Sequence, residues 1–103
     1  MLAKKRKKFP KLGKSPRQLE RHMKGVANHR RIEILFLIAR EKGITVENIA
    51  ERLNCNIKTI SVHTQRLSQA GLVQKNNRGR EVTHELSPYG KIIYNFLETF
   101  QHS

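Results

Sequence analysis

Two short amphipathic segments, separated by only a three-residue turn, constrain the fold of this chain more than any other feature. Residues 45–54 and 56–70 both carry apolar side chains at helical spacing, and the Asn-Cys-Asn between them leaves room only for a tight turn. Asn56 is a suitable N-cap for the second segment, and Gly71 is a suitable residue to end it. The pattern predicts a helix-turn-helix.

The second of these helices, residues 56–70, has two faces of different character. The side chains expected to be buried are Ile57, Ile60, Thr64 and Leu67. The side chains expected to face outward are Lys58, Thr59, Ser61, Val62, Gln65 and Arg66. Hydrogen-bond donors and acceptors of this reach suit the base edges in a DNA major groove, so we predict that this is a recognition helix.

A β-hairpin is expected directly after the recognition helix, over residues 72–86. Residues 72–75 and 82–86 have strand character, and Asn and Gly in the intervening tip, residues 76–81, tolerate positive φ. Such a hairpin is a wing, whose arginines can reach along the DNA backbone or into a minor groove. The wing residues expected to contact DNA are Lys75, Asn77, Arg78 and Arg80.

The remaining segments predict three further helices. Ser15 and Gln18 form a capping-box pattern at the start of residues 15–28, and Asn28 is a plausible cap for residues 28–43, which are apolar on most sides and belong in a core. A last helix should begin near Ser87. The expected fold class is therefore mainly α with a small β-hairpin, a winged helix-turn-helix of five helices plus the wing.

Cys55 and His84 are expected to have structural rather than chemical roles. Cys55, in the tight turn, should point inward as a small apolar plug. His84 shares a strand face with Val82 and Leu86, so we expect it to be partly buried.

The charge of the chain is large and uneven. The net charge is +13 with no Asp at all, and residues 1–31 hold 12 Lys and Arg against one acid, whereas residues 32–103 carry only +2. Such an excess favours a polyanion as partner, with double-stranded DNA ahead of an anionic membrane surface. No apolar run approaches the roughly 20 residues of a membrane span.

The organisation expected from this charge is a flexible basic N-terminal arm, residues 1–14, followed by one DNA-binding and dimerisation domain, residues 15–103. The arm residues expected to contact DNA phosphates are Lys4, Lys5, Arg6, Lys7 and Lys8.

Large apolar side chains recur along the last helix more densely than a small core needs. We expect them to form a homodimer seam together with the first helix. The residues expected at this interface are Leu19, Met23, Tyr89, Ile92, Ile93, Phe96, Leu97 and Phe100.

Three stretches resemble one known family. "ANHRRIEILFLIA" and "SVHTQRLSQAGLV" resemble the corresponding segments of the ArsR-type winged helix-turn-helix transcriptional regulators, and "NNRGREVTHELSPYGK" is similar to their wing and the turn after it, which MarR-like repressors share. The resemblance covers about residues 16–101. It implies a repressor that forms a homodimer through its first and last helices and binds a pseudo-palindromic operator.

The chain departs from the metal-sensing members of that family. Residues 45–54 lack their Cys pair, and the last helix offers only Glu98 and the terminal His102. We therefore expect no metal site and no cofactor, and the sequence does not indicate whether a small-molecule inducer exists. We also expect no enzyme, because the chain has no Asp, no Gly-rich phosphate loop and no nucleophile with a recognisable base.

The sequence predicts a DNA-binding transcriptional regulator, a repressor, located in the cytoplasm in association with the nucleoid. Two alternatives remain at this point. One is a low-specificity architectural protein of the nucleoid, and the other is a winged-helix protein-interaction module within a nucleic-acid complex.

Overall fold

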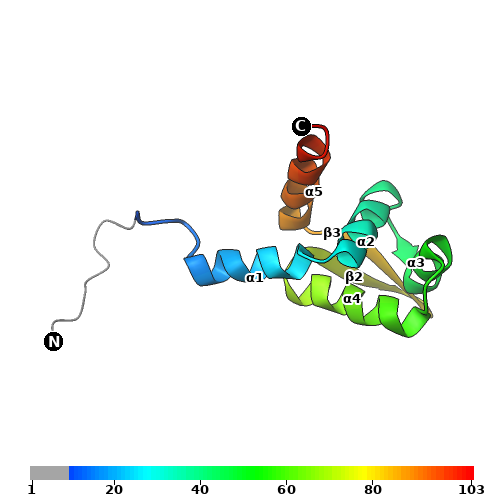
Figure 1. Cartoon of the computed structure of the whole chain (residues 1–103). Coiled ribbons are helices and arrows are strands. Elements are labelled where there is room, and N and C mark those ends of the chain that lie inside the picture. The colour runs from blue at the N-terminus through cyan, green and yellow to red at the C-terminus, as the bar shows by residue number, and fades with distance from the viewer. Residues whose placement is uncertain (1–9) are drawn as a thin grey trace, which may run out of the picture.

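The computed structural model describes residues 10–103, which form one helical body with a small sheet (Figure 1). The elements are α1 (Pro16–Val26), α2 (His29–Arg40), β1 (Ile44–Thr45), α3 (Val46–Leu53), α4 (Ile57–Gln69), β2 (Val73–Arg78), β3 (Glu81–Leu86) and α5 (Pro88–Phe100). The predicted fold class, five helices plus a hairpin in a winged helix-turn-helix, is confirmed.

Each helix begins at the capping residue that its sequence indicates. The Ser15 hydroxyl accepts from the Gln18 main-chain N–H while the Gln18 side chain accepts from the Ser15 N–H, which completes the capping box of α1. The other four N-caps are Asn28, Thr45, Asn56 and Ser87. These bonds satisfy main-chain donors that would otherwise lack partners in the first turn, so they fix where each helix starts.

The sheet has one strand more than the sequence predicts. β3 lies in the middle, with β2 on one side and the two-residue strand β1 on the other, all antiparallel. β1 pairs Ile44 with His84 and Thr45 with Thr83. A two-residue strand carries no alternation that sequence analysis could detect, yet it attaches the wing to the segment between α2 and α3.

The predicted hairpin boundaries are wrong at the tip. The strands run on to an Arg78–Glu81 pair, so the loop is only Gly79-Arg80 rather than residues 76–81. Gly79 has φ +62°, the positive value that a two-residue hairpin loop with Gly in first place requires. Asn76 and Asn77 are therefore strand residues, and their polarity reflects exposure rather than a turn.

The core is centred on α2. Its largest fully buried side chains are Ile34, Leu35 and Ile38 from α2, Ile49 from α3, Ile60, Thr64 and Leu67 from α4, and Leu72 and His84. Burial of Ile60, Thr64 and Leu67 confirms three of the four predicted inner positions of α4. This packing leaves the opposite face of α4 at the surface.

The burial of three single residues can be compared with the prediction for each. Ile57 is 42% exposed rather than buried, because it is the first residue of α4 and lies at the entrance of a groove instead of over the core. His84 is only 1% exposed, although its strand neighbour Val82 is at the surface. Cys55 is half-buried and packs against the core from the turn, as predicted.

The two helices expected at a dimer interface lie at the edge of the body. Figure 1 shows α1 extending away from the body and α5 projecting from it. The exposed apolar side chains on these helices are Leu19, Met23, Tyr89, Ile92, Phe96 and Phe100. Ile93 and Leu97 instead pack partly against the protomer's own core, so they serve the monomer as well.

Candidate nucleic-acid interface

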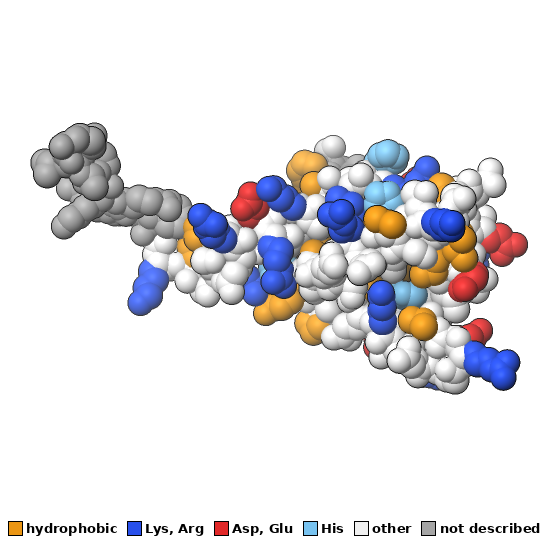
Figure 2. Space-filling model, turned by 90° about the horizontal axis from the view of Figure 1, so that it is seen from below, with side chains coloured by type: hydrophobic (Ala, Val, Ile, Leu, Met, Phe, Trp, Pro, Cys, Tyr) orange, Lys and Arg blue, Asp and Glu red, His pale blue; other side chains and the backbone are white. Residues whose placement is uncertain are grey.

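The outer face of α4 is exposed and mostly polar, with Val62 as an apolar member. The predicted outward residues Lys58, Thr59, Ser61, Val62, Gln65 and Arg66 are all exposed. Figure 2 views the molecule from the side on which α4 lies in Figure 1, and Lys and Arg side chains are spread across this face. The one hydroxyl on the inner face, that of Thr64, donates to the Ile60 carbonyl oxygen at 2.7 Å and is thereby satisfied.

A groove separates α4 from the wing. Ser61 and Gln65 line it from α4, and Lys75 and Arg80 line it from the hairpin. Glu47 and Glu81 also line the groove, so its charge is mixed rather than purely cationic. Four of the predicted DNA-contact residues, which belong to separate segments of the chain, therefore meet across one hollow.

The other two predicted wing residues are placed differently from each other. Asn77 is exposed and lies two positions after Lys75, on the same side of β2, because side chains alternate along a strand. Arg78 lies on the opposite side, where it lines a separate hollow with Lys42 and Asn76. Arg78 is therefore not part of the groove beside α4.

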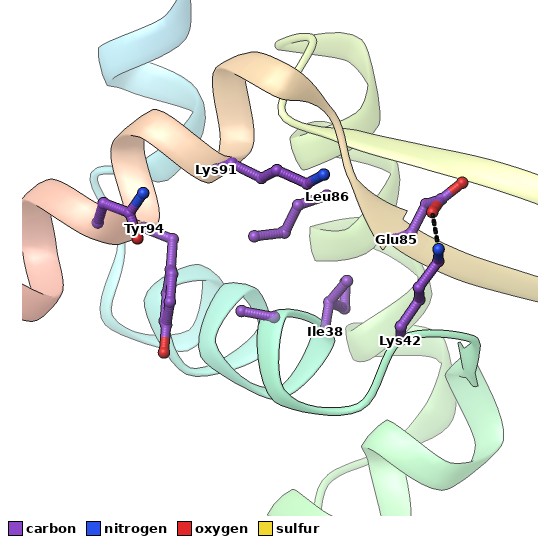
Figure 3. A pocket seen from close by; sticks show the side chains of 8 residues that line it. Ile38, Lys42, Glu85, Leu86, Lys91 and Tyr94 are labelled. Atoms are coloured by element: carbon purple, nitrogen blue, oxygen red, sulfur yellow. Dashed lines mark ion pairs between the residues drawn. The ribbon is translucent and has the colours of Figure 1, made fainter.

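Glu85, at the root of the wing, has two polar partners. Lys42, just beyond α2, forms an ion pair with Glu85 at 3.4 Å (Figure 3). The Asn76 amide donates to the other Glu85 oxygen at 3.0 Å. The Asn76 hydrogen bond and the Lys42 ammonium hold the pKa of Glu85 below its ordinary value. The ion pair connects β3 to the end of α2, and the Asn76 bond joins the two strands of the wing to each other.

The contacts of the wing border a pocket between α2, β3 and α5, which Figure 3 shows from close by. Ile38 and Leu86 form its apolar floor, and Lys91 and Tyr94 reach over it from α5. The pocket has a volume of about 290 Å³.

A second group of cations lies at the C-terminal end of α4. Sequence analysis predicted a DNA contact for Arg66 but not for the other members. Arg21 and Lys24 from α1 and Arg31 from α2 line one hollow with Arg66 and Gln69. The only signal in the sequence was the charge excess of residues 1–31, which cannot indicate that these side chains meet. Their arrangement depends on how α1 and α2 pack against α4.

The predicted DNA contacts of the basic arm lie outside the part of the chain that the structure describes. Lys4, Lys5, Arg6, Lys7 and Lys8 lie outside residues 10–103. Within that range no group of three His, Cys, Asp or Glu side chains lies close enough to hold a metal ion, and no helix is long and apolar enough to cross a membrane.

The comparisons with known proteins agree on the fold. One family model, described as HVO_A0114, matches residues 26–93, and no protein of curated function matches the chain. The homodimeric winged helix-turn-helix DNA-binding domain of Mb0332 from Mycobacterium bovis, a possible ArsR-family transcriptional regulator, is 27% identical with a TM-score of 0.75; the match covers 89% of this chain and 91% of that one.

Two further solved structures are similar. Reduced HlyU from Vibrio cholerae is 25% identical over 82% of this chain and 88% of that one, with a TM-score of 0.73. The transcriptional repressor PagR of Bacillus anthracis is 21% identical over 79% of this chain and 93% of that one, with a TM-score of 0.72, and supports the fold alone. Mb0332 is described as the DNA-binding domain of a possible transcriptional regulator rather than as an enzyme, which points away from catalysis.

Proposed function

The chain belongs to the HVO_A0114 family, and we propose that it is a transcriptional regulator, a repressor of ArsR-like type, that binds duplex DNA as a homodimer. The observation that carries the proposal is the exposed polar face of α4 beside a cationic wing, in a chain of net charge +13. α4 enters the major groove, where Thr59, Ser61 and Gln65 contact base edges. Regulators of this kind act on the chromosome, so we expect the protein in the cytoplasm in association with the nucleoid.

The wing contributes backbone and minor-groove contacts next to the reading helix. Lys75 and Arg80 line the same groove of the protein as Gln65, so they can contact phosphates of the DNA strand that borders the major groove. Arg78, on the other side of the hairpin, reaches the neighbouring backbone or minor groove from the tip.

Dimerisation places two reading helices on one DNA face. The exposed apolar side chains of α1 and α5 supply a surface that a second copy can cover, and Mb0332, which is similar to this chain, is homodimeric. A two-fold dimer of this type binds two half-sites whose centres are about 10–10.5 base pairs, or a multiple of that, apart.

The basic arm adds affinity without sequence preference. Residues 1–14 carry Lys4, Lys5, Arg6, Lys7, Lys8, Lys11 and Lys14 and no acid, so their expected contacts are to phosphates. The domain proper, in this proposal, starts at the Ser15 cap of α1.

Selection of bound sequences from random duplexes, followed by footprinting, tests the proposed function. A regulator should enrich a pseudo-palindromic site and prefer it over random duplex by a factor on the order of 10³ or more. An architectural protein would bind with steep salt dependence but enrich no site, and an interaction module would bind no duplex DNA at all. Either result would overturn the proposal.

A further inference from the structure

Four cationic side chains line a single hollow where α1, α2 and α4 meet. They are Arg21, Lys24, Arg31 and Arg66, and the rest of the lining is Gly25, Gln69 and Ala70. Among residues 10–103, no carboxylate lines the hollow. Lys24 pairs with Glu20 at 3.1 Å, but both side chains are largely exposed, so that pair is weak and does little to offset the other three cations.

Close packing of helices forces these like charges together. Gly25 lies directly against Ala70, and the absence of a β-carbon lets α1 approach the C-terminal end of α4. Gathering four cations raises the free energy of the folded protein unless an anion offsets their repulsion. The geometry therefore favours an anionic ligand in this hollow.

In the described part of the chain, Arg31 is oriented by neutral hydrogen-bond acceptors rather than by a carboxylate. Its Nη1 donates to Nδ1 of His63 at 3.2 Å, and its Nη2 makes a longer contact, 3.4 Å, to the Lys24 carbonyl oxygen. Its Nε is buried and has no hydrogen-bond partner among residues 10–103. A guanidinium that is oriented by neutral acceptors keeps its full charge available to an anion.

We propose that this hollow binds a phosphate of the DNA backbone, with Arg31 and Arg66 as its principal ligands. The proposal rests on the proposed function and extends the DNA contacts from the C-terminal end of the reading helix to α1 and α2. Arg66 and Gln69 continue the exposed face of α4 by one turn beyond Val62 and Gln65. A phosphate held here lies at the border of the groove that α4 enters and fixes how far the helix is inserted.

The pKa of His63, which contacts Arg31, should change when an anion occupies the hollow. The Arg31 guanidinium is always protonated, so His63 accepts through Nδ1 and carries its proton on Nε2 when neutral. Burial, followed by the charges of Arg31 and Arg30, with smaller effects from His29 and Arg66, lowers the pKa of His63 below its ordinary value. A bound phosphate offsets these cations, so it should raise that pKa.

Salt-dependent binding to duplex DNA tests the proposal. Each phosphate contact contributes about 0.9 to the slope of log K against log salt. Arg31→Gln and, at an exposed position, Arg66→Gln should each reduce the slope by about one. Lys91→Gln removes the same charge from α5 and should leave the slope unchanged, which controls for net charge. The inference is overturned if both arginine variants keep the wild-type slope.

Two further measurements separate the possible causes of failure. Wild-type protein that binds no duplex DNA would contradict the proposed function itself, whereas binding with unchanged slopes contradicts only the role of the hollow. The pKa of His63, followed by NMR of its imidazole nitrogens, should rise when duplex DNA is added. It should not rise when inorganic phosphate is added at matched ionic strength. A saturable rise with inorganic phosphate alone would identify a site for free anions and overturn the assignment to DNA.

Discussion

His84 joins the wing to the body of the protein through a hydrogen bond from its Nδ1 to the carbonyl oxygen of Ile44, at 3.0 Å. The ring is 1% exposed, and its Nε2 is buried without a partner among the described residues. Because a carbonyl oxygen can only accept, Nδ1 carries a proton, and burial of the ring, which lowers the pKa, disfavours a second proton on Nε2. The middle strand of the sheet is thus tied to β1 by a side chain as well as by main-chain pairing.

This buried ring makes stability depend on pH. Burial lowers the pKa of His84 below 6.5, although the bond to Ile44 partly opposes the effect. The unfolded chain therefore binds more protons than the folded one once the pH falls below about 6.5, so the stabilisation present above that value is lost as the pH falls further. We expect the free energy of unfolding in urea to decrease from pH 7 to pH 5.

Asparagine at position 84 should weaken this dependence, because its amide can still donate to Ile44 but does not titrate. His63, whose pKa is also lowered, contributes in the same direction, so His63→Asn should remove a separate part. His102→Asn, at an exposed position near the C-terminus, is the control and should leave the pH profile as in the wild type. A profile that His84→Asn does not flatten would contradict this account.

Gly90 sets the position of α5 against the sheet. A β-carbon at this residue would overlap the Leu72 carbonyl group, which is main chain and cannot rotate aside. Gly90→Ala gains about 1 kcal/mol of helix propensity but costs about 1–3 kcal/mol or more through overpacking, so we expect a net loss of stability in urea unfolding. Gly13→Ala, where a β-carbon meets nothing within 4 Å, should show no such loss. A more stable Gly90→Ala protein would show that α5 can shift freely.

The dimer interface is tested at Phe96. This side chain is 59% exposed and stacks on Phe100, which is itself exposed, with ring centroids 5.4 Å apart, so most of its apolar surface is free to meet a second copy. Phe96→Glu should sediment as a monomer and bind the selected DNA site on the order of 10²–10⁴-fold more weakly, because two linked half-sites become independent. Asn95→Glu adds the same charge at the neighbouring exposed position and should remain dimeric. Dimeric Phe96→Glu would place the interface elsewhere.

The reading helix should determine sequence preference. Thr59→Ala and Gln65→Ala remove no charge, so each should cost on the order of 1–3 kcal/mol on the selected site and little on random duplex. Arg80→Gln should weaken both, because it removes a backbone or minor-groove contact. Competition binding with the two kinds of duplex measures the difference. Equal losses on both duplexes for Gln65→Ala would show that α4 does not read bases.

The basic arm should act on affinity alone. Deleting residues 1–13 removes six Lys and Arg but leaves Lys14, whose ammonium lies 4.0 Å from the centre of the Tyr89 ring. The salt slope should fall by several units at about 0.9 per contact, with the selected sequence unchanged. Repeating the selection with the truncated protein checks the second part. A different selected sequence would mean that the arm itself contacts bases.

The sequence by itself determined the features that depend on neighbours within one turn of helix. Ser15, Asn28 and Asn56 start their helices because each side chain bonds to main-chain N–H groups two or three residues ahead. The same locality made the outer face of α4 predictable from the sequence, since helical periodicity places Thr59 and Gln65 off the face that buries Ile60 and Leu67. These relations hold wherever the segment is placed, which is why they could be predicted.

Only the tertiary structure decided what depends on distant segments. The strand β1 exists because Ile44 meets His84, forty residues away, and no pattern in two residues predicts it. Ile57 is 42% exposed because it faces the groove beside α4 rather than the core. Arg31 forms its hydrogen bond to His63 only because α2 packs on α4. Gly25, which has no β-carbon, lets α1 pack closely against Ala70 at the end of α4. Long-range pairs of this kind form when the free energy of burying the core outweighs chain entropy, and a local pattern carries no information about which pairs result.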